Sequence, residues 1–349
     1  MKFRLLFLPL IVISLVLSGC GRKNDVQRED GEFPKTVALS SEERPMNVVI
    51  KAGSIYLCGD YVVVYDRYEN AEFHYAVFNR GLEYLYSFCR KGVGPEECLI
   101  PTMVKDVDSN ICFLRDHGND TFYKYQLTDS GASFLGNAKL PSSETDFPFE
   151  INQLGDNRLL LKNTSYNKVR RQLWDFDKKE ILDVLPPSFD YEERLGSKYH
   201  PEYDDFWLVA DGKKFMSAYF FADCIEFGTI DNDKLKIDKY VGSLDSKDLY
   251  WYEDEPKTPE FKYNVDYNTV YYESVATGLN CFWAAYAGVR WGDLKAHSKI
   301  IERYSLDGSP EVKYELSEAV ESFIVLDNPS CIIGINPDMN EDNFLVYNL

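Results

Sequence analysis

The amino-acid sequence predicts an all-β fold, a six-bladed β-propeller with four strands in each blade. Three observations lead to this prediction. No long segment spaces its apolar residues as a helix does, whereas short apolar or alternating runs recur between Gly, Asn and Asp turns. A four-strand pattern of about fifty residues repeats six times along the chain. The last repeat ends after its third strand, and a surplus strand precedes the first repeat.

The second strand of each repeat is strongly apolar and sets the phase of the repeats. We expect these strands at residues 55–58, 111–114, 159–161, 214–219, 281–285 and 331–334. Each follows a turn of small or polar residues, such as Gly53-Ser54 or Asp211-Gly212. Turns between third and fourth strands are expected at residues 79–81, 129–131, 177–178, 231–233 and 307–308.

Residues 33–39 form the surplus strand, and we expect them to complete the last blade and close the ring. Closure would hide sheet edges that otherwise invite aggregation. A pair of β-sandwiches is the alternative fold. It does not explain why a missing strand at one end of the chain is matched by an extra strand at the other.

The N-terminus has the pattern of a secretion signal. Lys2 and Arg4 precede an apolar run over residues 5–17, which is too short to span a bilayer that needs about 20 residues. The following Leu-Ser-Gly-Cys resembles the lipobox of bacterial lipoproteins, which implies cleavage before Cys20 and attachment of lipid to it. A soluble secreted protein with an incidental Cys20 is the alternative.

The predicted organisation therefore has three parts. Residues 1–19 are a signal peptide, residues 20–32 are the lipidated cysteine and a charged, flexible tether, and residues 33–349 are the propeller. If residues 33–39 close the ring, the tether leaves from the face with short turns. The net charge of -19 argues against nucleic acid as a partner and against docking on anionic lipid head groups. Contact with the membrane would therefore come from the lipid attached to the protein.

The other seven cysteines include no C-x-x-C pair, which argues against a zinc knuckle or a redox dithiol. Several lie in apolar runs, and we expect small buried hydrophobic residues. An oxidising envelope would permit disulfides, but an odd number leaves at least one thiol unpaired.

A short motif follows the fourth strand of the first repeat, in which Gly92, Gly94, Pro95 and Glu97 match a Gly-x-Gly-Pro-Gly-Glu pattern. With the lipobox and six repeats, it resembles the TolB-like six-bladed propeller lipoproteins of Bacteroidetes. The resemblance implies the fold and a cell-envelope location, with no agreed chemistry. Glu96 replaces the usual glycine, which suggests a backbone without positive φ there.

The same motif lacks the third glycine and the lysine of a phosphate loop, so we interpret it as a structural turn between blades. Gly21 is not the aspartate that retains lipoproteins in the inner membrane, which favours the outer membrane, on either its periplasmic or its surface side.

Sequence motifs for common enzymes are absent. No histidine pair has the spacing of a helical zinc site, and no Gly-x-Ser-x-Gly elbow is present. Asp338 and Asp342 belong to an alternating run of Asn and Asp that weakly resembles a calcium loop. We expect no cofactor, with calcium left open. A calcium-dependent hydrolase or lyase of the lactonase type therefore remains the alternative function, and whether the protein is an enzyme is open.

Long insertions occur at residues 91–102, 186–206, 243–268 and 287–297. In a propeller all of them emerge on one face, which we call the insertion face; the opposite one is the short-turn face. The insertions are rich in aromatic and acidic residues, and the candidate ligand-binding residues are Tyr203, Trp207, Tyr250, Trp251, Tyr252 and Trp291. Flat rings beside carboxylates suit sugars and protein interfaces. The sequence thus predicts a binding or scaffolding module for a glycan, peptide or envelope protein. Aromatic residues that only pack each loop onto the propeller are the alternative.

Overall fold

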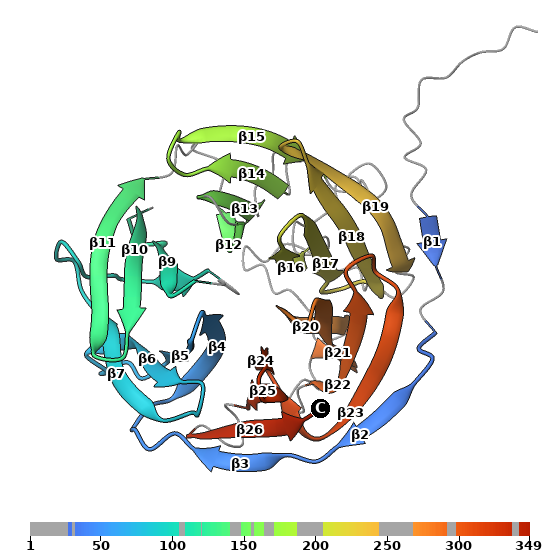
Figure 1. Cartoon of the computed structure of the whole chain (residues 1–349), viewed down its shortest axis with the longest axis horizontal. Helices are drawn as coiled ribbons and strands as arrows, with labels where there is room; N and C mark the ends of the chain where they lie inside the picture. Colours follow the sequence, from blue (N-terminus) through green and yellow to red (C-terminus); the bar gives the residue numbers. More distant parts are fainter. Residues whose placement is uncertain are drawn as a thin grey trace, which may run out of the picture.

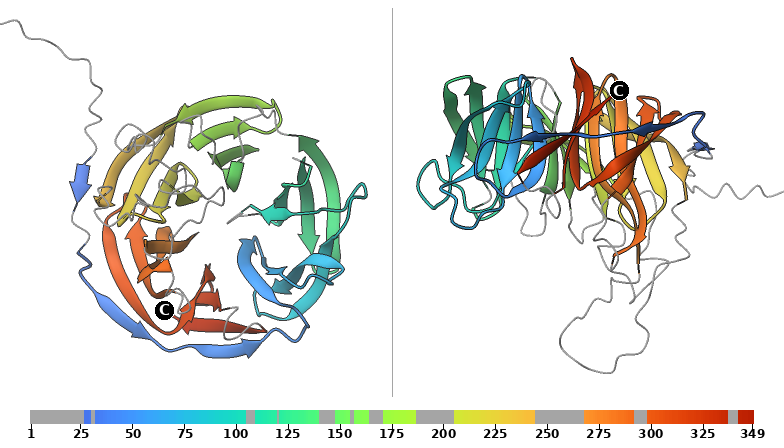
Figure 2. Two further views of the ribbon diagram at one scale, coloured as in Figure 1. Left: turned by 180° about the vertical axis from the view of Figure 1, so that it is seen from behind. Right: turned by 90° about the horizontal axis from the view of Figure 1, so that it is seen from below.

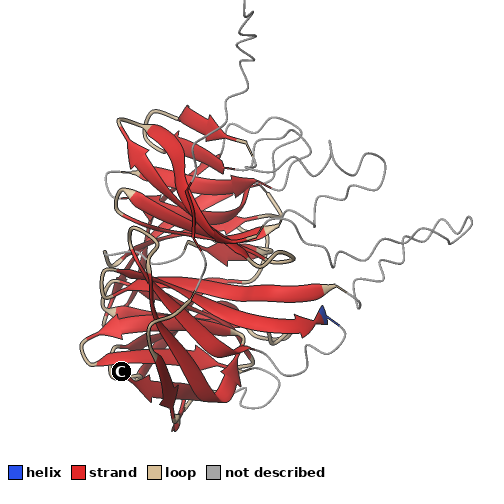
Figure 3. Ribbon diagram, turned by 90° about the vertical axis from the view of Figure 1, so that its right-hand side faces the viewer, coloured by secondary structure: helices blue, strands red, loops and turns tan. Residues whose placement is uncertain are grey.

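The computed structural model shows an all-β ring of six blades around a central axis (Figure 1). The described residues are 27–29, 32–104, 109–119, 121–139, 148–154, 157–163, 171–186, 205–243, 268–291, 298–336 and 342–349. Strands make up every blade in the side view (Figure 3). Within those ranges, no helix has the length and apolar character needed to cross a bilayer. The predicted fold class is confirmed; Cys20 and the signal lie outside the described residues and stay predictions.

Each blade is an antiparallel sheet whose first strand lies nearest the axis. Blade 1 contains β4 (Ala52–Cys58), β5 (Tyr61–Asp66), β6 (Phe73–Asn79) and β7 (Tyr84–Arg90). Blade 2 contains β8 (Pro101–Met103), β9 (Ile111–Asp116), β10 (Thr121–Thr128) and β11 (Gly131–Lys139). Blade 3 contains β12 (Pro148–Leu154), β13 (Arg158–Asn163), β14 (Arg171–Asp175) and β15 (Glu180–Leu185).

The second half of the ring repeats this order. Blade 4 contains β16 (Phe206–Asp211), β17 (Lys214–Tyr219), β18 (Cys224–Asp231) and β19 (Lys234–Gly242). Blade 5 contains β20 (Thr269–Gly278), β21 (Cys281–Arg290), β22 (Ser298–Ser305) and β23 (Pro310–Val320). Blade 6 contains β24 (Ser322–Asp327), β25 (Ser330–Ile335), β26 (Asn343–Asn348) and β3 (Glu42–Pro45).

The N-terminal segment wraps around the outside of three blades (Figure 2). β1 (Gln27–Glu29) adds a parallel fifth strand to blade 4 beside β19, and β2 (Thr36–Leu39) does the same in blade 5 beside β23. Both run in the direction of the fourth strands that they join, from the short-turn face toward the insertion face. β1 lies inside the segment predicted as a flexible tether, so the backbone of three residues there is paired. The direction in which the anchor leaves stays a prediction.

The strand that closes the ring lies later in the chain than the sequence predicts. β3 pairs antiparallel with β26 and supplies the missing fourth strand, whereas residues 36–39 of the predicted closing strand form β2 in blade 5. The four residues of β3 are all exposed. An outermost strand packs on one side at most, so it carries no apolar pattern by which the sequence could reveal it.

Five of the six predicted second strands are second strands in the structure, and blade 1 is the exception. Residues 55–58 belong to its first strand, β4, and the second strand is β5. Gly53-Ser54 resembles a turn in the sequence, but it lies in an irregularity where the pairing shifts between Ala52 and Ile55. The chain reverses at Gly59-Asp60, where Gly59 has a positive φ of 55°.

The described residues form six hydrophobic clusters, each between two neighbouring blades. Alternate residues of one strand serve opposite clusters: in β5, Val62 and Val64 pack toward blade 6, and Tyr61 and Val63 toward blade 2. Both faces of a blade are therefore buried. This explains why the inner strands are continuous apolar runs rather than alternating ones. All seven cysteines from Cys58 onward are buried without forming a disulfide, as expected of small hydrophobic residues.

Candidate functional site

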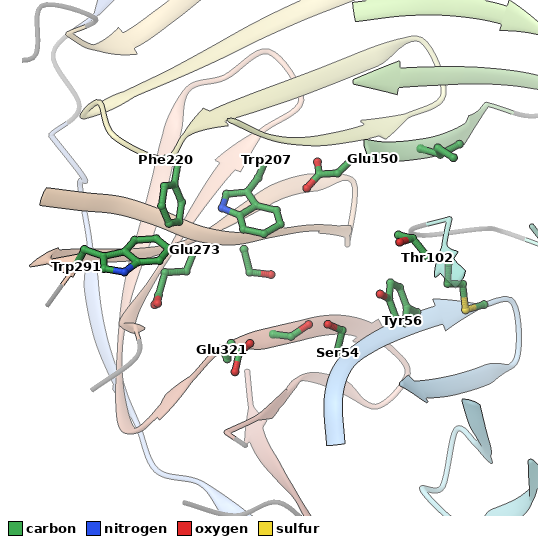
Figure 4. A pocket seen from close by; sticks show the side chains of 13 residues that line it. Ser54, Tyr56, Thr102, Glu150, Trp207, Phe220, Glu273, Trp291 and Glu321 are labelled. Atoms are coloured by element: carbon green, nitrogen blue, oxygen red, sulfur yellow. The ribbon is translucent and has the colours of Figure 1, made fainter. Parts of the chain in front are cut away.

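A cavity of about 450 Å³ lies on the ring axis, where the first strands of the blades begin (Figure 4). Every blade contributes to its wall. The lining residues are Ser54, Tyr56, Thr102, Met103, Glu150, Ile151, Trp207, Phe220, Glu273, Ser274, Trp291, Glu321 and Ser322. First strands begin, and second strands end, on the insertion face. The cavity therefore opens on the face that carries the long connections.

One side of the cavity is aromatic and comes from blades 4 and 5. Trp207 lies near the start of β16, Phe220 directly after β17, and Trp291 directly after β21. The ring centroids of Phe220 and Trp291 are 5.1 Å apart in an edge-on arrangement, and those of Trp207 and Phe220 are 6.4 Å apart. The Trp207 Nε1 donates to the Tyr272 carbonyl at 2.9 Å, which fixes the indole across the blade boundary. Trp291 at the rim is 39% exposed.

Three carboxylates from three blades face the same space. Glu321 forms an ion pair with Arg67. Glu273 accepts hydrogen bonds at Oε2 from the backbone N (2.7 Å) and the hydroxyl (2.6 Å) of Ser298. The Glu150 Oε2 accepts from the backbone N of Leu208 at 2.6 Å. These hydrogen bonds hold the acids at defined positions on the wall.

Hydroxyl groups complete the wall opposite the aromatic side. Tyr56 and Ser54 lie on β4, and both line the cavity. Burial raises the pKa of Tyr56 to about 12, so its hydroxyl stays protonated at neutral pH. Thr102 hydrogen-bonds the His117 Nε2 at 2.9 Å. The cavity thus offers aromatic faces, hydroxyl groups that donate and accept, and carboxylates that only accept.

The structure places two of the six predicted ligand-binding residues, Trp207 and Trp291, in the cavity wall. The other four, Tyr203, Tyr250, Trp251 and Tyr252, lie outside the described residues.

The weak calcium candidates are also divided. Asp338 lies outside the described residues, and the Asp342 carbonyl accepts from the Met46 backbone N at 2.8 Å. In the described part of the chain, no group of three or more His, Cys, Asp or Glu residues is arranged to hold a metal ion.

The Gly92–Glu97 motif lies in the connection between blades 1 and 2. The Glu97 carboxylate accepts from the Gly94 backbone N at 2.9 Å, and Pro95 is part of the tight turn between them. A Cβ at Gly92 would lie 2.0 Å from the Glu97 Oε2, so a side chain there would displace the carboxylate. Glu96 has no positive φ, in agreement with its departure from the glycine of the pattern.

The acids of the cavity were missed from the sequence. Three acids of the wall belong to the first strands of blades 3, 5 and 6: Glu150 within β12, Glu273 within β20 and Glu321 directly before β24. Each directly precedes an inner-strand residue that also lines the cavity. An alignment of the first strands would have found this repeat of position. The second strands, which set the predicted phase, do not reach the axis.

Exposed hydrophobic side chains gather on the same face as the cavity. Among the residues described, six large ones occupy connections there: Val49, Tyr68, Val93, Leu99, Ile100 and Trp291. Val93 is 84% exposed and Ile100 61%. Exposed apolar side chains that gather on one face are typical of interaction sites.

No family model matches the chain, and no curated protein matches its sequence. Among solved structures, it is similar to a protein of Bacteroides fragilis NCTC 9343 assigned as exported, with a TM-score of 0.56 and 14% identity over 90% of this chain and 99% of that one. A member of the DUF4221 family from Bacteroides vulgatus gives a TM-score of 0.53 and 12% identity over 89% of this chain and 97% of that one. The likeness shows the propeller fold.

Proposed function

We propose that the protein is a binding module of the bacterial cell envelope that captures a partner on its insertion face, in and around the central cavity. The observation that carries the proposal is the composition of the cavity wall. The rings of Trp207, Phe220 and Trp291 from blades 4 and 5 converge there with three carboxylates from blades 3, 5 and 6. Ligand sites typically combine such apolar walls with a few fixed polar groups, and a volume of about 300–1,000 Å³ is usual.

The exposed hydrophobic side chains on the connections of the insertion face support a partner larger than the cavity itself. Val93 and Ile100 lie beyond its wall, in the connection between blades 1 and 2. A partner that fills the cavity and also covers these connections would bury apolar surface that water now contacts. A peptide or protein suits that description better than a short glycan.

Anchoring at the outer membrane through Cys20 is part of the proposal, as is membership of the TolB-like propeller lipoproteins. The lipobox sequence supports it, and the exported assignment of one similar structure is in keeping with it. The alternative function is a calcium-dependent hydrolase or lyase.

Crosslinking in intact cells tests the proposal. One dominant partner should be recovered with the wild-type protein and lost with Trp291→Ala, which removes an exposed ring at the cavity rim. Tyr84→Ala serves as the control, because Tyr84 is similarly exposed at 36% but lies at the start of a fourth strand, on the short-turn side. Equal recovery with both variants would refute the site. A large rise in melting temperature with calcium, reversed by a chelator, would favour the hydrolase.

A further inference from the structure

We propose that the central cavity recognises an organic cation, the ammonium or guanidinium group of a lysine or arginine side chain on a polypeptide partner. Glu150 would be its counter-ion and Trp207 its aromatic wall. The inference rests on the proposed binding function and names the chemistry of its ligand.

Glu150 carries the argument, because one of its two carboxylate oxygens is unpaired. The residue is only 6% exposed, and its Oε2 is occupied by the backbone N of Leu208. The Oε1 is buried and has no hydrogen-bond partner among the described residues. The carboxyl group extends into the cavity beside the Trp207 ring (Figure 4). Lys162 lies opposite Glu150 in the β12–β13 pair, and its Nζ pairs with Asp205. The Glu150 Oε1 is therefore a buried acceptor that lacks a hydrogen-bond donor among the described residues, and a bound cation would supply one.

The other charged groups nearby are already compensated. Glu321 is paired with Arg67, and the Glu273 Oε2 is bonded twice by Ser298. Lys162 is the nearby cation: its Nζ lies 5.8 Å from the centroid of the Trp207 ring, and it pairs with Asp205 at 2.6 Å. Among the described residues, no Lys, Arg or His lines the cavity. The wall is therefore acidic, and Glu150 is the carboxylate that it leaves open.

The surroundings suit an organic cation better than a metal ion. Metal ions such as calcium require six or more oxygen ligands that converge. Within the described ranges no three acidic, histidine or cysteine side chains are so arranged. One carboxylate beside an indole is instead the arrangement that binds ammonium and guanidinium groups, through charge and through the negative face of the ring.

A polypeptide is favoured as the source of the cation because of what surrounds the charged group. Met103 and Ile151 give the cavity an apolar wall on which the aliphatic stem of a long side chain could pack. Outside the cavity, Ile100 lies two residues before the cavity-lining Thr102 and is 61% exposed, so the rim there offers apolar surface to the flanking residues of a peptide. A free small amine would use the cavity and leave this rim uncovered.

Calorimetric titration of the purified full-length protein tests the inference. The probes are an acetylated, amidated Gly-Lys-Gly peptide, the same peptide with norleucine in place of lysine, and n-butylammonium. We expect the lysine peptide to bind at least about thirtyfold more tightly than its uncharged counterpart, as is usual when one member of a buried charge pair is removed. n-Butylammonium should bind more weakly than the lysine peptide. If it binds equally well, the source is a free amine and the polypeptide part is overturned.

Glu150→Gln provides the matched variant. Its amide oxygen can still accept from the Leu208 backbone N, while the cavity receives a neutral group in place of the charge. We expect the lysine peptide to lose the same factor, about thirtyfold, and the norleucine peptide to be unaffected. Glu180→Gln, at an exposed position in the turn region of blade 3, should leave both affinities unchanged.

Equal affinity of the two peptides for the wild-type protein would overturn the inference without any variant, so it is testable even if Glu150→Gln fails to fold. Unchanged lysine binding in a folded Glu150→Gln variant would overturn the role of Glu150. If crosslinking still captures a partner that depends on Trp291 while the lysine peptide does not bind, the binding function stands and only its cationic ligand is wrong.

Discussion

Replacing Arg171 by Met should destabilise the ring by about 3–5 kcal/mol, because Arg171 is the counter-charge of a fully buried glutamate. Arg171 on β14 of blade 3 is 0% exposed, and its Nη2 forms an ion pair with Glu226 on β18 of blade 4. The Nε donates to the Ser217 hydroxyl at 3.0 Å, and the guanidinium lies 4.4 Å from the centre of the Phe206 ring. The pair thus crosses a blade boundary.

The magnitude follows from which groups the substitution leaves behind. Met fills a similar volume, so the loss of packing is small. Glu226 remains, with 0% of its side chain exposed and no counter-charge, and such an unpaired buried charge accounts for most of the cost. Replacing both partners, as in Arg171→Met with Glu226→Leu, removes the buried charges together. The double variant should recover most of the stability and keep a deficit of about 1 kcal/mol for the unpaired Ser217 hydroxyl.

Urea unfolding followed by tryptophan fluorescence measures both effects, since Trp174 is fully buried in blade 3. The free energy of unfolding should fall in the order wild type, double variant, single variant. A single variant within about 1 kcal/mol of the wild type would refute the reasoning, because a surface ion pair has a value of that size. A double variant that is less stable than the single one would show that packing, not charge, dominates.

Three further predictions concern the N-terminal strands β1 to β3, the buried thiols and the pH dependence of stability. A chain that begins at Ser40 lacks β1 and β2 and should lose about 2 kcal/mol of stability. A chain that begins at Met46 also lacks β3, which exposes the edge of β26, and it should aggregate when analysed by size-exclusion chromatography. Hydrogen bonding to neighbouring thiols and burial raise the pKa values of Cys89 and Cys112. A thiol reagent at pH 8 should therefore leave both residues unmodified in the native protein and label both after unfolding without reductant. Missing label after unfolding would indicate a disulfide. Burial raises the pKa of Glu302, so the contribution of this residue to stability is present below the ordinary glutamate pKa and is lost as pH rises through the raised value. The melting temperature of Glu302→Gln should therefore rise relative to that of the wild type between pH 4 and pH 8. No relative rise would contradict this.

The inner strands of the blades could be predicted because each of them is buried on both faces. The side chains of Tyr61-Val62-Val63-Val64 pack alternately in two blade interfaces, and the resulting continuous apolar run predicts a strand. The outer strands could not be predicted in this way. Glu42–Pro45 closes the ring by backbone pairing with β26, and its four exposed side chains carry no apolar pattern that would identify a strand.

The candidate site was predicted only on its aromatic side. Trp207 and Trp291 could be identified from the sequence because large aromatic residues are unusual in connections that are exposed to solvent. Glu150 has no such signal, since a single acid near an apolar run is most often a solvated residue at the end of a strand.

By itself the sequence determined the all-β class, the number of blades and the face on which the long connections emerge, because turn residues and apolar runs act over a few neighbours. Only the tertiary structure decided which strand closes the ring and which side chains meet on its axis. Glu150, Glu273 and Glu321 belong to three different blades, and they face one cavity only because the closed ring turns every first strand toward the centre. That the Glu150 Oε1 stays unpaired there depends on all the neighbours that the ring brings to it, and no local pattern records them.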